Sequence, residues 1–409
     1  MKSLLYFLLA LVLFSSCTTP ENKKSHFPQG DFILSILFQN DDNETYKLPI
    51  EVSLTSLENN PTIKIKNGKE IITVKEINWR NDSLLFKMPV FLSEFKLAFV
   101  NEKFIGEFIL NDREEPISYF VTGKKSTERF AAKQATSNIQ GNWKTTFTYP
   151  DGEAYPAIGE FYQEGNIVTG TFLTETGDYR YLKGVLDEDS LKLSAFDGSH
   201  VFLFLAELDN DSLKGIFKGS NSHLEYWKAQ KNEIFKLGNP DSLTYLKPGF
   251  KSIEFNFPNL KGEEVTFPSE KFNNKVVIVQ LMGSWCPNCM DETAFFTELY
   301  DKYKPQGLEI ISLAFERFKD FNKASSAVSR VKTHFDAKYH FLIAGTSSKE
   351  NASNALPMIN AVMSYPTAIF INKKGEVVKI HTGFSGPGTS EYTPYVLETT
   401  GLVEELLSE

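Results

Sequence analysis

Hydrophobic and polar residues alternate over short segments from residue 31 to about residue 231. Residues 62–66 alternate in this way, Asn67 and Gly68 follow, and a second apolar-rich segment starts at Ile71. Asn-Gly between two such segments is a strong β-hairpin signal, because both residues tolerate the positive φ of a tight turn. No helical stripe of useful length interrupts this region, so the sequence predicts antiparallel β structure.

A faint internal repeat runs through this β region. Residues 82–84 (Asp-Ser-Leu) and 104–106 (Phe-Ile-Gly) resemble residues 189–191 (Asp-Ser-Leu) and 213–215 (Leu-Lys-Gly), at a spacing of about 107 to 109 residues. We interpret the repeat as two related β modules. Chance similarity between strand-turn segments is the alternative.

The predicted domain organisation follows from these patterns. The modules lie near residues 31–130 and 138–231, and each is expected to be a small antiparallel sandwich or partly closed barrel. Neither contains a catalytic signature, so they are expected to position the last domain or to bind a partner. Residues 232–250, with scattered Gly and Pro, are interpreted as a linker. Residues 251–409 are expected to form a separate α/β domain.

The pattern changes in this last domain. Residues 275–281 are almost continuously apolar, as in a strand buried on both faces, and residues 292–303 repeat apolar side chains at helical spacing. A β-α-β order followed by a hairpin predicts a mixed sheet flanked by helices. The remaining segments predict, in order, a strand, a helix and a strand pair: residues 308–314, 321–335, 367–372 and 376–380.

Composition restricts the class of protein. The chain has 409 residues, with 41% hydrophobic and 23% charged residues and a formal net charge of −9. Such a length suggests two or three folded domains and excludes bulk disorder, a collagen-like chain and a polytopic membrane protein. The acidic balance also argues against nucleic acid as a partner, because phosphate binding requires clustered Lys and Arg.

Two of the three cysteines, Cys286 and Cys289, flank a predicted strand-to-helix turn. Backbone N–H groups at a helix N-terminus stabilise a thiolate, which is the attacking species in thiol–disulfide exchange. We expect Cys286 at the exposed tip to attack and Cys289 to resolve the mixed disulfide. The redox-active disulfide would then lie in the chain itself, with no further cofactor.

A structural zinc site or two unrelated core cysteines are the alternatives. Structural zinc usually needs four Cys or His ligands. The domain has no other cysteine, and His334, His340 and His381 show no paired spacing. The sequence therefore predicts no metal.

The third cysteine, Cys17, follows a basic start, an apolar segment over residues 3–14 and two serines. The apolar segment is shorter than the ~20 residues that span a bilayer, and its flanks are those of a secretory signal. The arrangement resembles a bacterial lipobox, although Phe14 is not the preferred aliphatic residue. The resemblance implies a signal peptide over residues 1–16, a diacylated Cys17, and a tether over residues 17–30. The alternative is an ordinary cleaved signal with a chance cysteine.

Residues of the last domain resemble the thioredoxin fold. The resemblance rests on Trp285, Cys286 and Cys289 after a buried strand, and on Tyr365 and Pro366 before a later strand. It implies a cis peptide bond before Pro366 that presents the Tyr365 backbone to substrate, with Trp285 also in the substrate-binding site. The alternative for Pro366 is a trans proline that opens a strand.

A narrower resemblance is to the TlpA/ResA-like membrane-tethered thioredoxins. It rests on Glu292, three residues after the second cysteine, together with the hairpin expected over residues 255–272. It implies that Glu292 assists proton transfer at Cys289; a favourable carboxylate in the first turns of a helix is the alternative. Gln280 replaces the buried Asp of thioredoxin, which increases the dependence on Glu292. Asp291 points elsewhere round the helix, so we expect it to matter less.

Three functions remain in competition. The first is a lipid-anchored thiol–disulfide oxidoreductase of the cell envelope, facing the periplasm or the exterior, that reduces protein disulfides with electrons from a thiol donor. The second is a peroxiredoxin-like thiol peroxidase, although Gly283 stands where that family has a hydroxyl residue. The third is a non-catalytic lipoprotein in which the β modules bind a partner. The sequence predicts no oligomeric state.

Overall fold

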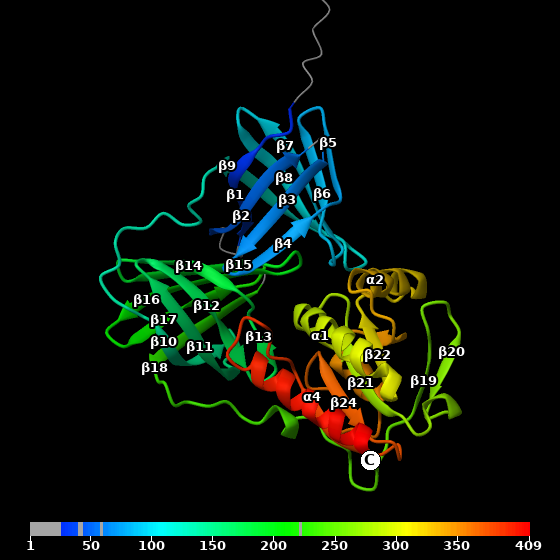
Figure 1. Cartoon of the computed structure of the whole chain (residues 1–409). Helices are drawn as coiled ribbons and strands as arrows, with labels where there is room; N and C mark the ends of the chain where they lie inside the picture. Colours follow the sequence, from blue (N-terminus) through cyan, green and yellow to red (C-terminus); the bar gives the residue numbers. More distant parts are fainter. Residues whose placement is uncertain (1–25, 40–43, 58–59, 221–222) are drawn as a thin grey trace, which may run out of the picture.

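The computed structural model describes residues 26–39, 44–57, 60–220 and 223–409. Two β sheets and an α/β domain follow one another along the chain (Figure 1). The predicted signal peptide, Cys17 and most of the tether lie outside the described residues. Among the described helices, none combines the length and the apolar character needed to cross a bilayer.

The first sheet has nine antiparallel strands in the order β4-β3-β2-β1-β9-β8-β7-β6-β5. The hairpin predicted around Gly68 is present: β3 pairs with β4, and Gly68 has a φ of 53°. Alternate side chains enter the core, as Ile63 and Ile65 do on β3. The strands are β1 (Gly30–Gln39), β2 (Thr45–Leu57), β3 (Asn60–Asn67), β4 (Glu70–Val74), β5 (Ile77–Arg80), β6 (Ser83–Lys87), β7 (Ser93–Val100), β8 (Lys103–Leu110) and β9 (Ile117–Lys125).

The second sheet closes into a barrel, because β12 pairs with both β11 and β14. Its interior is filled by aromatic side chains such as Phe147, Phe172, Phe204 and Trp227, which contact one another at 4.8–6.2 Å between ring centroids. The strands are β10 (Gly141–Thr148), β11 (Ala154–Glu164), β12 (Ile167–Thr174), β13 (Gly177–Asp178), β14 (Leu182–Asp187), β15 (Ser190–Phe196), β16 (Val201–Asp209), β17 (Ser212–Lys218) and β18 (Leu224–Lys231).

Both sheets follow the same connectivity. If β1 is matched with β10 and each later strand with its counterpart, all eight strand pairings of the first sheet recur in the second, and the last strand pairs with the first in each sheet. The β12–β14 pairing, which closes the second sheet, has no counterpart between β3 and β5 in the described part of the chain. The repeated glycines, Gly106 and Gly215, occupy β8 and β17. A Cβ at either position would lie only 2.0 Å or 1.9 Å from a carbonyl oxygen of the neighbouring strand, that of Lys96 or Leu205. This correspondence supports the internal repeat.

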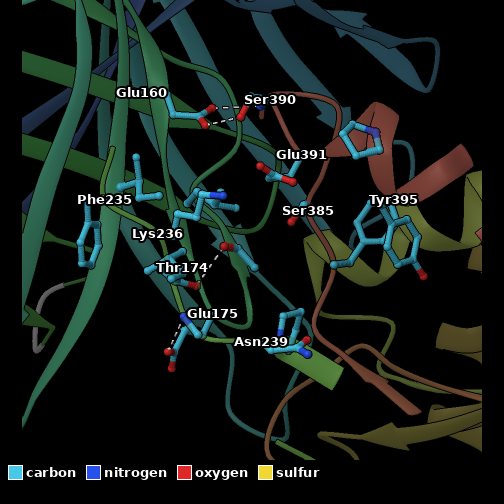
Figure 2. Close-up of a pocket in the computed structure, with 18 of the residues that line it drawn as sticks. Glu160, Thr174, Glu175, Phe235, Lys236, Asn239, Ser385, Ser390, Glu391 and Tyr395 are labelled. Carbon is cyan, nitrogen blue, oxygen red and sulfur yellow. Dashed lines mark hydrogen bonds between the residues drawn. The ribbon is translucent and has the colours of Figure 1, made fainter. Parts of the chain in front are cut away.

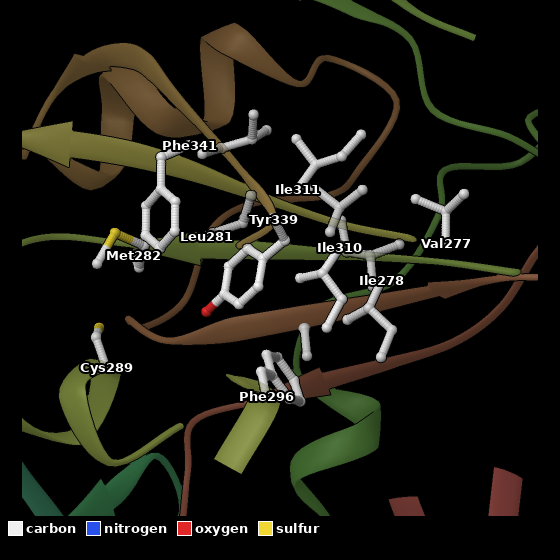
Figure 3. Close-up of a cluster of buried hydrophobic side chains, with 14 of the residues drawn as sticks. Val277, Ile278, Leu281, Met282, Cys289, Phe296, Ile310, Ile311, Tyr339 and Phe341 are labelled. Atoms are coloured by element: carbon white, nitrogen blue, oxygen red, sulfur yellow. The ribbon is translucent and has the colours of Figure 1, made fainter. Parts of the chain in front are cut away.

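The C-terminal domain has a five-stranded mixed sheet in the order β23-β22-β21-β24-β25. Central β21 is parallel to β22 and antiparallel to β24, so the sheet is mixed, as the sequence predicted. Side chains of β21, β22 and α1 pack with Tyr339 and Phe341 in its core (Figure 3). The elements are β19 (Phe255–Pro258), β20 (Glu264–Phe267), β21 (Val276–Met282), α1 (Pro287–Tyr303), β22 (Leu308–Glu316), α2 (Phe321–His334), β23 (His340–Thr346), α3 (Lys349–Ala355), β24 (Thr367–Ile371), β25 (Val377–Thr382) and α4 (Tyr392–Ser408).

Residues 232–250, predicted as a linker, pack against the C-terminal domain. Asp241 lies in a short 3₁₀ turn (Pro240–Ser242), and its Oδ1 is 2.6 Å from Nδ1 of His381 on β25. Lys379 of the same strand pairs with the other carboxylate oxygen at 3.1 Å. The segment is therefore fixed to the domain that it precedes.

Candidate active site

Cys286 and Cys289 form a disulfide at the N-terminus of α1. Cys286 is the N-cap residue with an extended backbone, and Pro287 begins the helix with the φ that the first turn requires. The Cys286 Sγ accepts a hydrogen bond from the backbone N–H of Cys289 at 3.2 Å. A sulfur in this position receives the unpaired N–H groups of the first turn, which favour a thiolate once the disulfide is reduced.

The expectation that Cys286 lies at an exposed tip is wrong. Cys286 is only 4% exposed and Cys289 is fully buried. The reason is the segment before β24, whose backbone packs over the pair: the carbonyl oxygen of Tyr365 lies 3.7 Å from the Cys286 Sγ. The first sulfur is therefore covered on this side by the Tyr365 backbone.

The three residues expected to bind substrate surround the disulfide. The peptide bond between Tyr365 and Pro366 is cis, as predicted. The rings of Trp285 and Tyr365 contact edge to face at 5.6 Å between centroids. The Pro366 carbonyl accepts a hydrogen bond from the N–H of Gly383 at 2.8 Å, so the loop after β25 also lies at this site.

Glu292, three residues after Cys289 on α1, is fully buried on the side of the helix that faces Tyr395 of α4. Its carboxylate accepts hydrogen bonds from Nε2 of Gln280 at 2.9 Å and from the hydroxyl of Tyr395 at 3.2 Å. Burial raises its pKa to about 8, and these two hydrogen bonds oppose the rise. Burial therefore favours the protonated form of this side chain at neutral pH.

Sequence reasoning missed two residues at the end of β22. Glu316 accepts hydrogen bonds from the backbone N–H and the hydroxyl of Ser284, at 2.7 Å and 2.6 Å, and burial raises its pKa to about 7. The Arg317 guanidinium lies 4.6 Å from the centre of the Trp285 ring. The sequence could have predicted these two residues. Parallel strands end at the same edge of a sheet, so the end of β22 had to lie beside the end of β21.

The β barrel also contributes to this site, which the sequence did not indicate. The short segment around β13 reaches the residues between the two cysteines: Nη1 of Arg180 is 3.4 Å from the Pro287 carbonyl, and Asp178 lies 3.4 Å from Nδ2 of Asn288. These residues are more than 100 positions apart in the chain, and no local pattern links them.

A cavity of about 510 Å³ lies at the same interface between barrel and C-terminal domain (Figure 2). On one side, Glu160 of β11 accepts hydrogen bonds from the backbone N–H and hydroxyl of Ser390, which precedes α4. Phe384 lines the cavity, and its carbonyl accepts a hydrogen bond from Nδ2 of Asn288 at 3.1 Å. The cavity thus borders the segment that carries the disulfide. The described residues contain no cluster of three or more side chains suited to a metal ion.

Comparison with known proteins identifies the C-terminal part. Residues 247–395 match the redoxin family model. This part of the chain is a redoxin domain. The thiol-disulfide oxidoreductase ResA of Halalkalibacterium halodurans is 29% identical over 139 residues, which is 34% of this chain and 69% of ResA. ResA of Geobacillus kaustophilus is 29% identical over 140 residues, 34% of this chain and 72% of that protein.

Among solved structures, a putative thiol:disulfide interchange protein DsbE from Chlorobium tepidum matches with 18% identity and a TM-score of 0.29, over 38% of this chain and 99% of its own. The redoxin domain is distantly homologous to ResA-type enzymes. With its Cys286–Cys289 pair it is a thiol–disulfide oxidoreductase of the thioredoxin fold, which confirms the predicted fold and enzyme class.

Proposed function

We propose that the protein is a membrane-tethered enzyme that reduces protein disulfides outside the cytoplasm. The observation that carries the reductase chemistry is the Cys286 Sγ at the N-cap of α1, hydrogen-bonded to the N–H of Cys289. This position stabilises the thiolate that must attack a substrate disulfide. The adjacent Tyr365 backbone and Trp285 ring offer a polar edge and an apolar face to an extended polypeptide.

The exchange requires two steps. The Cys286 thiolate attacks one sulfur of the substrate disulfide, which forms a mixed disulfide and releases the other substrate sulfur as a thiolate. The Cys289 thiolate then attacks Cys286, which forms the intramolecular disulfide and releases the second substrate thiolate. Two electrons pass to the substrate, so a dithiol donor must later reduce the Cys286–Cys289 pair.

Glu292 is the proposed proton carrier for the second step. Cys289 must lose its proton before it attacks, and Glu292 follows it by three residues, on a neighbouring part of the same helix face. When ionised, the carboxylate accepts the proton; when protonated, it returns a proton in the reverse direction. Gln280 fixes its orientation through the hydrogen bond described above.

The membrane tether rests on the sequence alone. The apolar segment before Cys17 has the length and flanks of a secretory signal, and the cysteine stands where lipidation would occur. Two or more acyl chains give stable anchoring, whereas one is marginal. We propose that the diacylated Cys17 holds the β modules and the redoxin domain at the surface of a membrane in the cell envelope.

The activity is tested with a soluble form that lacks residues 1–18. We expect the reduced protein to convert the disulfide of a model protein substrate to two thiols and to become oxidised in equal amount. Cys286→Ser is the control and should be inactive. A protein that is oxidised rapidly by hydrogen peroxide yet leaves protein disulfides intact would instead be a thiol peroxidase. A protein inert to both would have only a binding role.

A further inference from the structure

The barrel segment around β13 is built to fit the start of α1. Gly177 lies so close to the redoxin domain that a Cβ would be 2.4 Å from Nδ2 of Asn288. On the other side, a Cβ at Gly383 would lie 2.4 Å from the backbone oxygen of Thr176. The two backbones thus interlock beside the disulfide, with no space for larger residues.

Arg180 is the centre of this contact. Its guanidinium pairs with Asp291 of α1 at 2.7 Å and with Glu70 of the first sheet at 2.6 Å, and it reaches the Pro287 carbonyl at 3.4 Å. The three carboxylate and guanidinium side chains are only 11–18% exposed. One side chain therefore joins all three folded parts, within one helical turn of the cysteines.

We propose that Arg180, although it belongs to the β barrel, is a positioning residue of the redox site that stabilises the Cys286 thiolate. The inference rests on the proposed function and adds a role for the modules: they complete the electrostatic environment of the disulfide. The charge of Arg180 acts on the sulfur through the first turn of α1, which begins at the next residue after Cys286.

The positive charge of Arg180 is surrounded by carboxyl groups. Glu70, Asp178 and Asp291 all lie next to Arg180 or to the residues between the cysteines. Burial raises the pKa of Asp291 to about 7, and the Arg180 charge opposes that rise. Without Arg180, the sulfur would lose a nearby positive charge, and those acidic groups that stay ionised would destabilise a thiolate.

The barrel also supplies Asp197, whose charge acts on Arg180, and the first module supplies Asp112, which pairs with Arg317. The remaining charged groups belong to the redoxin domain: Glu292 bonded to Gln280, Glu316 bonded to Ser284, and Arg317 over Trp285. None of them contacts Arg180 by a hydrogen bond or ion pair among the described residues, so they stay unchanged when Arg180 is replaced. Their effect on the thiol pKa should therefore be the same in the wild type and in the Arg180 variants.

The test compares Arg180→Gln with Asp291→Asn in the soluble form that contains all three parts. Removal of the positive charge should raise the Cys286 thiol pKa by about one unit, and removal of the negative charge should lower it. This prediction replaces the expectation from the sequence that Asp291 matters less, because Asp291 pairs with Arg180 at 2.7 Å. The equilibrium constant for exchange with glutathione should change with the Cys286 thiol pKa. Arg180→Gln should make the Cys286–Cys289 pair more reducing, by up to about tenfold in that constant or about 30 mV in potential. Asp291→Asn should make the pair more oxidising.

The opposite signs separate charge from structure. Both substitutions break the same ion pair, so a merely structural role would shift both variants in one direction. Arg180→Lys should restore most of the wild-type potential, because it keeps the charge. Arg330→Gln is the matched control: Arg330 also joins the redoxin domain to the first sheet, through Glu76 and the Met88 carbonyl, but it does not contact the cysteine segment.

Two failures are distinguishable. If the wild-type pair does not exchange with glutathione at all, the proposed function is wrong. If it exchanges but Arg180→Gln and Asp291→Asn keep the wild-type thiol pKa and potential, or shift them with the same sign, Arg180 is only a structural link between domains.

Discussion

At the scale of single residues, short-range motifs predicted the centre of the site, and distant contacts escaped prediction. The cysteine pair, Glu292, and the Tyr365–Pro366 bond were visible because each belongs to a local pattern. The burial of Cys286 was not, because it depends on the segment before β24 that packs over it. Arg180 was missed for the same reason: its partners come from other domains.

The two cysteines are expected to have separate roles. Cys286→Ser should abolish exchange, and Cys289→Ser should accumulate mixed disulfides with substrates, because the first sulfur lies at the N-cap and the second is fully buried. Non-reducing electrophoresis of each variant after incubation with a disulfide-containing protein measures the trapped species. Trapping by Cys286→Ser, and none by Cys289→Ser, would reverse the two roles.

Glu292→Gln should change the pH dependence of exchange. The carboxyl is ionised only above its pKa of about 8, so its loss should lower the pKa of thiols that titrate in that range, and loss of the proton carrier should slow resolution by roughly 100-fold. Stopped-flow pH–rate profiles and thiol titration measure both effects. Glu298→Gln, on the exposed side of α1, is the control. Superimposable profiles for Glu292→Gln and the wild type would leave Glu292 with a structural role only.

The same carboxyl should make stability depend on pH. Its pKa is about 8 in the folded protein and about 4.5 when exposed, so its contribution to stability is complete below pH 4.5 and is lost as pH rises toward 8. As pH rises through this range, the free energy of unfolding of the wild type should therefore fall relative to that of Glu292→Gln, by up to about 1.4 kcal/mol per pH unit. Urea unfolding at pH 5 and pH 8 tests this; an equal difference at both values would contradict it.

At the scale of elements, periodicity predicted the strands and helices but not how the sheets close. The hairpin at Gly68, the mixed sheet and helices α1 and α2 follow from local alternation or helical spacing. Closure of the second sheet depends on the pairing of β12 with β11 and β14. The alternation of apolar and polar residues predicts which side chains of a strand face inward, but it does not predict which strand pairs with an edge strand.

Two glycines allow a test of element packing. In β17, Gly215→Ala would place a Cβ 1.9 Å from the Leu205 carbonyl, so the barrel should lose about 1 to 3 kcal/mol of stability. In α4, Gly401 has open space around it, and Gly401→Ala should stabilise the redoxin domain by up to about 1 kcal/mol. Urea unfolding followed by circular dichroism measures both. Equal effects of the two substitutions would contradict the close approach of β17 to its neighbour.

At the scale of the whole molecule, the three folded parts meet at the redox site. The first sheet supplies Glu70, and the loop after β8 supplies Asp112, which pairs with Arg317. The barrel supplies Asp178 and Arg180, while the redoxin domain carries the cysteines. The homology to ResA covers about a third of the chain, so the modules are an addition to that domain. Domain boundaries drawn from the sequence gave no indication that they meet there.

The tether is a property of the whole chain. Cys17→Ala should release the protein from membranes in the cells that produce it, because the proposed acyl chains have no other attachment site. Exchange activity of the released protein should be unchanged, since Cys17 lies far along the chain from the redox pair. Membrane fractionation tests this; a variant that is cleaved after the signal and still sediments with membranes would contradict a lipid anchor.

The most direct test of the account is the reduction potential of the Cys286–Cys289 pair, measured against glutathione or dithiothreitol buffers in the soluble form. We predict a reversible two-electron couple in which only these two thiols change, with a potential near that of thioredoxin, about −270 mV. A potential near −120 mV would identify an oxidant in place of a reductase. Failure of the pair to interconvert reversibly would contradict the proposed thiol–disulfide chemistry itself.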